Sequence, residues 1–180
     1  IQLMTMYNIL VTGVAGFIGS NLAKQFVADG KRVFGFDNLC RGNLSNLDSL
    51  QGNALFSFEE VDLSDLDAYK AALMQVMKTE SISEVWHMAA NSDIPAGISN
   101  MNIDLRDTFM TTTNTLQLMK EFSIRVIAFA SSSAIYGDLG DAKLVEDIGP
   151  LFPISNYGAM KLASEAAISA AAENFIDRAY

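Results

Sequence analysis

The sequence lacks the features that mark several classes of protein. It has a single cysteine, Cys40, so no disulfide can form within the chain, and a reducing, cytoplasmic location is expected. No apolar run approaches the roughly 18 residues of a membrane-spanning helix. The segment Ile1–Tyr7 has neither the basic region nor the long apolar core of a signal peptide, and Met6 is a candidate for the native first residue.

Basic side chains are also scarce. The 180 residues include 12 Lys and Arg against 21 Asp and Glu, which gives a formal net charge of −9. This balance argues against a broad basic surface for nucleic acid and against docking on an anionic membrane. Any phosphate ligand must therefore be held locally, by backbone amides or by a few placed cations.

The composition itself favours a folded protein. Half of the residues are hydrophobic and 18% are charged, which is unlike a disordered chain. The length fits one domain with a substantial core.

Strand-like and helix-like segments alternate along the chain. The short apolar segments predicted as strands are Tyr7–Thr12, Arg32–Asp37, Leu55–Val61, Glu84–Met88 and Arg125–Ala130. The segments predicted as helices run from Ile18 to Gly30, from an N-cap at Ser64 through Lys78, over Ile103–Phe122 and over Asn156–Phe175, with a short helix allowed within the loop Asn38–Gly52. This order predicts an α/β fold with a doubly wound parallel sheet of Rossmann type, in which ligands bind at the carboxyl ends of the strands.

A glycine-rich turn follows the first predicted strand. Gly13, Gly16 and Gly19 form the pattern G-x-x-G-x-x-G between that strand and the next helix. Such glycines permit a tight turn, let the backbone approach a pyrophosphate and let the helix pack close to the strand. The helix N-terminus adds free N–H groups and a partial positive charge. The pattern predicts a dinucleotide site, with a plain glycine turn as the alternative.

Acidic residues follow the second and third predicted strands. Asp37 stands where a carboxylate can accept hydrogen bonds from the adenosine ribose hydroxyls and can repel a 2′-phosphate. It therefore favours NAD over NADP, although Arg41 is placed to pair with such a phosphate. Asp62 is a candidate for contact with the adenine. The alternatives are a solvated loop acid for Asp37 and a turn residue for Asp62.

Tyr157 and Lys161 are separated by four residues, which places both side chains on one face of the last predicted helix. A neighbouring ammonium group stabilises a phenolate and lowers the tyrosine pKa from about 10, and an oxidised nicotinamide would act in the same direction. The pair is therefore a candidate general acid/base for an alcohol, with an exposed surface pair as the alternative. The fifth predicted strand leads into Ser131–Ser133, where a hydroxyl can bond the reacting oxygen or cap the loop.

These motifs resemble the extended short-chain dehydrogenase/reductase family, in its branch of NAD-dependent sugar-nucleotide epimerases and dehydratases. The matching segments occur in the family order over nearly the whole chain: V-T-G-V-A-G-F-I-G-S-N-L (Val11–Leu22), F-D-N-L (Phe36–Leu39), V-D-L (Val61–Leu63), H-M-A-A (His87–Ala90), S-S-S-A-I-Y-G (Ser131–Gly137) and Y-G-A-M-K (Tyr157–Lys161). The resemblance implies an NAD-binding Rossmann domain that acts on a nucleotide sugar.

The resemblance also implies roles for individual residues. Tyr157 is the expected catalytic acid/base, Lys161 its partner, and Ser132 the catalytic hydroxyl, four residues before Tyr136. The expected cofactor-binding residues are Gly13, Gly16, Phe17, Ile18, Gly19, Asp37, Asn38, Arg41, Asp62, Leu63, Ala89, Ala90, Tyr157 and Lys161. No metal site is predicted.

Two residues at the positions after the catalytic serine bear on the reaction. The family's 4,6-dehydratases carry an Asp–Glu pair there, whereas this chain has Ser133 and Ala134. An acid for water elimination is missing, which favours a nucleotide-sugar 4-epimerase that works through a transient 4-keto intermediate. The alternatives are a 4,6-dehydratase or another nucleotide-sugar oxidoreductase of the family, and, in another class, an NAD-binding module without turnover.

Two stretches depart from the family pattern. Asn91–Gly97 does not match the usual V-x-x-S element of galactose epimerases, and Thr111–Thr115 retains only Thr115 of the usual N-x-x-G-T element. The nucleotide and the sugar are therefore left open. His87, the only histidine, is interpreted as structural, and Cys40 as an unreactive thiol beside the adenosine.

The family also sets an expectation for length and for assembly. Its enzymes continue into a sixth strand and a smaller substrate-binding domain, whereas this chain ends at Tyr180, with Ile176–Tyr180 approaching that strand. Residues 1–180 are therefore interpreted as the NAD-binding half, which is expected to hold NAD but not to turn over a sugar nucleotide alone. The helices over Ile103–Phe122 and Asn156–Phe175 correspond to the family's four-helix dimer interface, so a homodimer is expected, with packing inside the monomer as the alternative.

Overall fold

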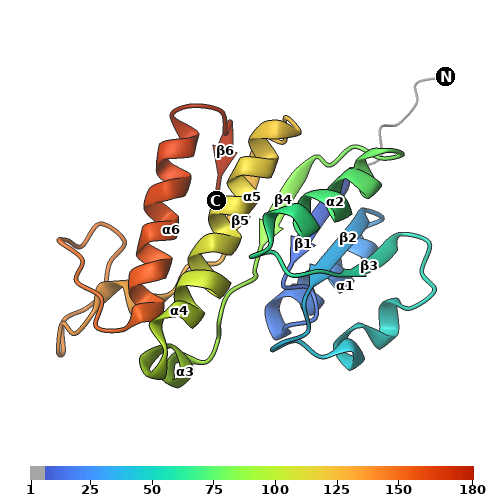
Figure 1. Cartoon of the computed structure of the whole chain (residues 1–180). Coiled ribbons are helices and arrows are strands. Elements are labelled where there is room, and N and C mark those ends of the chain that lie inside the picture. Colours follow the sequence, from blue (N-terminus) through green and yellow to red (C-terminus); the bar gives the residue numbers. More distant parts are fainter. Residues whose placement is uncertain (1–6) are drawn as a thin grey trace.

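The computed structural model describes residues 7–180, so Met6 lies outside the described residues. These residues form an α/β fold around one parallel sheet (Figure 1). The strands are β1 (Asn8–Thr12), β2 (Arg32–Asp37), β3 (Phe56–Glu60), β4 (Glu84–His87), β5 (Val126–Phe129) and β6 (Arg178–Ala179). Their order is β3-β2-β1-β4-β5-β6, which is the predicted doubly wound sheet. The order reverses between β1 and β4, where such folds open a ligand crevice.

The helices cover both faces of this sheet. They are α1 (Phe17–Ala28), η1 (Leu44–Leu50), α2 (Leu66–Met77), α3 (Ile94–Ser99), α4 (Met101–Asp104), η2 (Leu105–Met110), α5 (Thr111–Glu121), η3 (Ser133–Tyr136) and α6 (Asn156–Ala172). Alternate residues of β1 enter different cores: Ile9 and Val11 pack with α1 and η1, whereas Leu10 packs with α2, α5 and α6. Because both faces are buried, the strands read as continuous apolar segments.

The N-cap that the sequence predicted for α2 is wrong by one residue. Asp65 caps the helix by accepting a hydrogen bond from the Ala68 N–H at 3.0 Å. The Ser64 hydroxyl instead donates to Asp62 Oδ1 at 2.7 Å, so it is not available as the cap. The helix consequently begins at Leu66.

The helix predicted over Ile103–Phe122 is present as a continuous helical rod that begins at Met101 and contains a π-helical segment, η2. Its threonine hydroxyls donate to carbonyls one turn earlier, as Thr112 does to Thr108 O at 2.9 Å and Thr115 to Thr111 O at 2.7 Å. Such bonds satisfy hydroxyls inside a buried helix and accompany local changes of helical winding. Neither η2 nor the short helix α3 was predicted.

The last helix begins as predicted and ends earlier than expected. The Ser155 hydroxyl caps α6 by accepting from the Gly158 N–H, and the helix stops at Ala172 rather than Phe175. The chain then turns into β6, which pairs in parallel with β5, as the segment Ile176–Tyr180 indicated. Within residues 7–180, no helix has both the length and the apolar character needed to cross a membrane.

Candidate functional site

The glycine turn packs directly against the end of β4. Gly13 adopts a left-handed backbone conformation with φ of +65°, and a Cβ there would lie 2.8 Å from the backbone of Ala89. A Cβ on Gly19 would run into the carbonyl oxygen of Gly13. Both positions therefore require glycine for close approach of backbone segments, which is one of the roles that the sequence pattern predicted.

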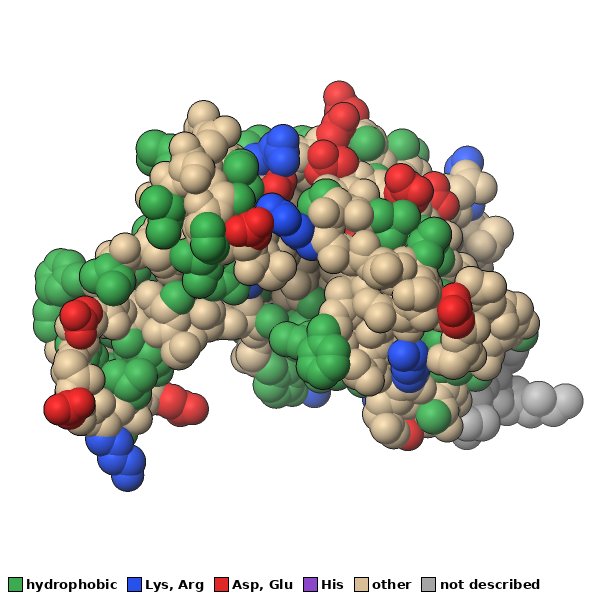
Figure 2. Space-filling model, turned by 90° about the horizontal axis from the view of Figure 1, so that it is seen from below, with side chains coloured by type: hydrophobic (Ala, Val, Ile, Leu, Met, Phe, Trp, Pro, Cys, Tyr) green, Lys and Arg blue, Asp and Glu red, His purple; other side chains and the backbone are tan. Residues whose placement is uncertain are grey.

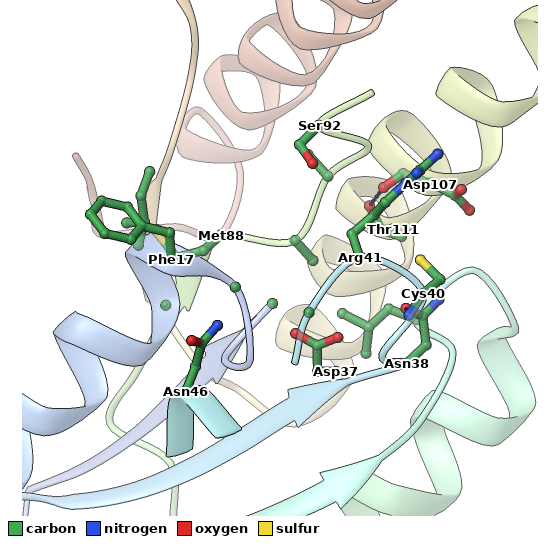
Figure 3. Close-up of a pocket in the computed structure, with 18 of the residues that line it drawn as sticks. Phe17, Asp37, Asn38, Cys40, Arg41, Asn46, Met88, Ser92, Asp107 and Thr111 are labelled. Carbon is green, nitrogen blue, oxygen red and sulfur yellow. Dashed lines mark hydrogen bonds between the residues drawn. The ribbon is translucent and has the colours of Figure 1, made fainter. Parts of the chain in front are cut away.

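A cavity of about 530 Å³ opens at the carboxyl ends of β1, β2 and β4 (Figure 3). Of the residues predicted to bind the cofactor, those that line it are Gly13, Gly16, Phe17, Ile18, Gly19, Asp37, Asn38, Arg41, Leu63, Ala89 and Ala90. Among the described residues, no side chain caps α1 at Gly16, so the N–H groups of its first turn are left for a ligand. The structure thus brings together segments that are far apart in the sequence.

Asp37 stands in the wall of this cavity with only 7% of its surface exposed. One carboxylate oxygen accepts from the Ala15 N–H at 2.9 Å and the other accepts from the Leu39 N–H at 2.8 Å. Figure 3 shows the carboxylate between the glycine turn and the loop that carries Arg41. Asp37 is therefore built into two turns and is not a freely solvated loop acid.

Arg41 lines the cavity and is already paired. Its guanidinium lies 3.0 Å from a carboxylate oxygen of Asp93, which directly precedes α3. Arg41 follows β2 and Asp93 follows β4, the strands on either side of β1. The ion pair is partly exposed, with 43% and 37% of the two side chains accessible. Arg41 is thus held by an acid that the sequence did not indicate as its partner.

Asp62 is the predicted adenine contact that the cavity does not include. Its neighbours Val61 and Leu63 line the cavity, whereas the Asp62 carboxylate accepts hydrogen bonds from the N–H and the hydroxyl of Ser64. This geometry supports the alternative interpretation of Asp62 as a turn residue.

Further lining residues were not predicted to bind the cofactor, namely Cys40, Gly42, Asn46, Val61, Met88, Ser92, Asp107 and Thr111. Asn46 is the most informative of them, because its amide donates to the Ala15 carbonyl at 2.8 Å and ties η1 to the glycine turn. The Asn- and Gly-rich composition around it predicted a loop but gave no signal for this contact. Thr111 occupies the first position of the altered N-x-x-G-T element, and that alteration was the available signal.

Ser132, Tyr157 and Lys161 lie together after the carboxyl end of β5, the strand next to β4, and none of the three lines the cavity. The Lys161 side chain is buried, with 2% exposed, and its ammonium donates to the Ala130 carbonyl at 2.6 Å. The ammonium also lies 5.8 Å from the centre of the Tyr157 ring. Ser132 caps η3 by accepting from the Ala134 N–H at 3.2 Å, and hydrogen bonding by its hydroxyl acts to lower the pKa of Tyr157. Ser132 therefore combines a capping role with an effect on the tyrosine.

The electrostatics of this group differ from the simple expectation for a Tyr–Lys pair. Burial raises the pKa of Tyr157 above its usual value, the hydrogen bond from Ser132 lowers it, and the charge of Asp104 raises it. Burial lowers the pKa of Lys161 to about 8. The predicted lowering of the tyrosine pKa by Lys161 is therefore not produced by these side chains, because burial of the phenol dominates.

His87 has the structural role that the sequence suggested. It is fully buried, and burial lowers its pKa to about 3, so the ring is neutral. The Thr112 hydroxyl donates to the Thr108 carbonyl, so its oxygen accepts from the imidazole Nε2–H at 3.1 Å. The Thr12 hydroxyl can then donate to Nδ1 at 2.8 Å. Both ring nitrogens are satisfied by these threonines.

Cys40 is exposed at the edge of the cavity. Its partial burial and the charge of Asp107 raise the pKa of the thiol, which reduces the thiolate fraction at neutral pH.

Figure 2, which views the carboxyl ends of the strands, shows a hollowed centre with Lys and Arg side chains placed singly or beside Asp and Glu. Phosphates on this face would depend on backbone N–H groups, as the charge balance indicated.

Comparisons with known proteins agree with this geometry. A model described as the NAD dependent epimerase/dehydratase family matches residues 9–179. A UDP-glucuronate 4-epimerase of Thermodesulfobacterium geofontis is 34% identical over 161 residues, which cover 87% of this chain and 48% of that protein. A probable dTDP-glucose 4,6-dehydratase of Sinorhizobium fredii is 32% identical over 167 residues, which cover 87% of this chain and 47% of that protein.

A solved structure gives the same picture. The crystal structure of a UDP-glucose 4-epimerase of Thermus thermophilus in complex with NAD superposes with a TM-score of 0.82 at 28% identity, over 93% of this chain and 51% of that chain. The chain spans about half the length of the curated relatives it matches.

Proposed function

The chain belongs to the NAD-dependent epimerase/dehydratase family, and we propose that it supplies the cofactor-binding and catalytic half of a nucleotide-sugar 4-epimerase. The observation that carries the proposal is the group of Ser132, Tyr157 and the buried Lys161 after β5, the strand next to β4, together with the cavity that the glycine turn and the end of β4 line. No acidic residue follows Ser132, since Ser133 and Ala134 occupy the next positions. The group can therefore move one proton at an alcohol but lacks an adjacent acid for elimination.

The cavity fits the family's cofactor, NAD. Glycine at positions 13 and 19 keeps side-chain atoms out of the turn, and the uncapped start of α1 offers N–H groups to a pyrophosphate. Asp37 would face the adenosine ribose from the end of β2. Bound NAD would supply the acceptor for a hydride from the sugar and the donor that returns it.

The residues of the chain would then handle the proton and the substrate oxygen. Ser132 would donate a hydrogen bond to the sugar 4-oxygen, and Tyr157 would accept the proton of the 4-hydroxyl and later return it. Lys161, fixed by the Ala130 carbonyl, would supply positive charge near the phenol. Return of the hydride to the other face of a 4-keto sugar would invert the 4-carbon.

A panel of nucleotide sugars tests this proposal. Full-length protein is incubated with NAD and with UDP-, GDP-, CDP- and dTDP-sugars, and the products are identified by NMR. Epimerised sugar without net accumulation of NADH is the expected result. A 4-keto-6-deoxy product would instead support the dehydratase alternative, and NAD binding with every sugar inert would support a module without turnover.

The Arg41–Asp93 ion pair makes cofactor choice testable. Because Asp93 holds the guanidinium, Arg41 is not free to pair with a 2′-phosphate. Replacement of Asp93 by Ala should release Arg41 and raise the affinity for NADP about 1.5- to 5-fold, a gain typical of one exposed charge pair. Affinity for NAD should stay within about twofold. Fluorescence titration with both cofactors measures the change, and the double variant with Arg41→Ala should lose the gain. Equal NADP affinity in wild type and Asp93→Ala would contradict this account.

We also propose that the protein is a homodimer that packs through α6 and the rod of α4, η2 and α5. Figure 1 shows α5 and α6 side by side, and small residues such as Ala166 and Ala170 leave the outer surface of α6 open to close approach. Large apolar side chains are exposed on the rod, including Met101 with 58% and Met110 with 39% of their surfaces. Sedimentation of the full-length protein at micromolar concentration should give the mass of a dimer. A monomer at that concentration would contradict the proposal.

A further inference from the structure

Asp104 is a fully buried carboxylate outside the cofactor cavity. It lies at the end of α4 with none of its surface exposed. One carboxylate oxygen accepts from the Asn91 side-chain amide at 2.8 Å, whereas Oδ2 has no hydrogen-bond partner among the described residues. A buried carboxylate with an unpaired oxygen is unfavourable for folding, so its presence calls for a role other than stability.

Asn91 connects this carboxylate to the end of β4. Its side-chain amide donates to Asp104 and also to the Asp93 carbonyl at 2.9 Å, and its amide oxygen accepts from the Asp93 N–H at 3.0 Å. Its own backbone N–H donates to the Thr108 hydroxyl at 3.1 Å. The segment after β4 is thereby fixed to the helical rod at both Asp104 and Thr108.

Gly97 connects the same carboxylate to α6, the helix that carries Tyr157 and Lys161. A Cβ at Gly97 would collide with Asp104 Oδ2, so the unpaired oxygen packs directly against the backbone of α3. The Gly97 carbonyl accepts from the Asn156 side-chain amide at 2.9 Å. Asn156 is the first residue of α6 and immediately precedes Tyr157. Asp104 therefore determines where α3 can lie, and α3 holds the start of α6.

Among the acids of the described residues, Asp104 is the one whose charge acts on Tyr157, and Glu165 on α6 acts on Lys161. Lys161 lies on α6, Asp93 is paired with Arg41 before α3, and Arg106 and Asp107 on η2 are paired with each other. The charge of Asp104 raises the pKa of Tyr157, whereas hydrogen bonding by Ser132 lowers it.

We propose that Asp104 is a positioning residue for Tyr157, which holds the start of α6 through Asn91 and Gly97 and whose charge acts on the phenol. The proposal rests on the proposed role of Tyr157 as the acid/base. Two substitutions separate its two parts. Asp104→Asn keeps the size and an acceptor for Asn91 but removes the charge, whereas Asp104→Ala removes both.

The ionisation of Tyr157 can be measured without turnover. Full-length protein with NAD is titrated by ultraviolet absorbance of the phenolate, and the curve of a Tyr157→Phe variant is subtracted from each background. In Asp104→Asn, the pKa of Tyr157 should fall, because an opposing negative charge has been removed. The acid limb of any epimerase pH profile should move to lower pH with it, while kcat at the optimum is retained. Asp67→Asn, an exposed acid on α2, is the matched control and should change neither curve.

Asp104→Ala should lower kcat with little change in KM or NAD affinity, because the start of α6 loses its support, and Asp104→Asn should restore most of that loss. Asp104→Asn should also melt no lower than wild type, whereas a purely structural carboxylate predicts a lower Tm.

An unchanged Tyr157 titration in folded Asp104→Asn overturns the charge part of the proposal. Equal kcat in Asp104→Ala and wild type overturns the positioning part. If no sugar is turned over, the proposed function fails while the absorbance titration still decides the charge part.

Discussion

Replacing Tyr157 by Phe should lower the kcat of the full-length protein by about 10²- to 10⁴-fold, the usual contribution of a general acid/base. The change removes only the hydroxyl and keeps the ring, so the packing beside Lys161 is preserved. Because Tyr157 lies outside the lining of the glycine-rich cavity, NAD affinity should remain within about threefold of wild type, or ~0.7 kcal/mol. Single-turnover kinetics with the sugar found by the panel, and cofactor titration, measure the two quantities.

The reason for so large an effect lies in the environment of the phenol. Burial raises the pKa of Tyr157, so its ionisation depends on the groups that surround it. The hydroxyl of Ser132 acts toward a lower pKa, and the ammonium of Lys161 is held close by the Ala130 carbonyl. The pKa of Lys161 is lowered to about 8, so this ammonium loses its proton as the pH rises through that value. Phenylalanine at position 157 would remove the phenol of this group, and with it the proposed proton acceptor and donor at the substrate.

Tyr7 provides the matched control for this prediction. It is a phenol just before β1, and its hydroxyl donates at 2.8 Å to Glu84 at the amino end of β4, whereas Lys161 beside Tyr157 bonds to Ala130 after the carboxyl end of β5. Tyr7→Phe should leave kcat unchanged within about twofold and should weaken folding by about 1 kcal/mol, the usual value of one hydrogen bond. A Tyr157→Phe enzyme that keeps kcat within tenfold of wild type would contradict the assignment of Tyr157.

Most of the fold could be predicted because its determinants are local and repeated. The strands carry continuous apolar segments, as Ile9 to Val11 show, and the sheet order follows from their alternation with helices. Gly30, with φ of +76°, ended the first helix where the sequence indicated. Boundaries failed where two polar residues compete for one role, as Ser64 and Asp65 do at the start of α2.

The parts of the site that sequence patterns missed depend on contacts between distant segments. The pairing of Arg41 with Asp93 and the contact of Asn46 with the glycine turn involve loops whose relative placement no local pattern encodes. Asp104 looked like an ordinary helix residue, and only its burial beside Gly97 shows that it is unusual. By contrast, the spacing of Tyr157 was informative because both members of the pair lie on one helix.

Replacing Gly13 by Ala should remove most NAD binding and destabilise the fold strongly, whereas the same change at Gly30 should do neither to that extent. Both glycines have positive φ, +65° and +76°, so both substitutions carry the left-handed penalty of roughly 1–2 kcal/mol. At Gly30 a Cβ would meet nothing within 4 Å, whereas at Gly13 it would lie 2.8 Å from the backbone of Ala89. Backbone atoms cannot rotate away, so the end of β4 must move.

The difference in stability and NAD affinity between the two variants therefore isolates the close contact between the glycine turn and Ala89. Overpacking adds about 1–3 kcal/mol to the backbone penalty, so Gly13→Ala should lower the free energy of unfolding by about 2–5 kcal/mol in urea titrations. Because Met88 and Ala89 line the cavity, their displacement should also weaken NAD binding by at least about tenfold, or ~1.4 kcal/mol. Gly30→Ala should keep NAD affinity, since Gly30 lies at the other end of α1 from the cavity. Equal losses of stability and of NAD affinity in both variants would mean that the left-handed backbone, and not the approach of β1 to β4, is what the glycine turn requires.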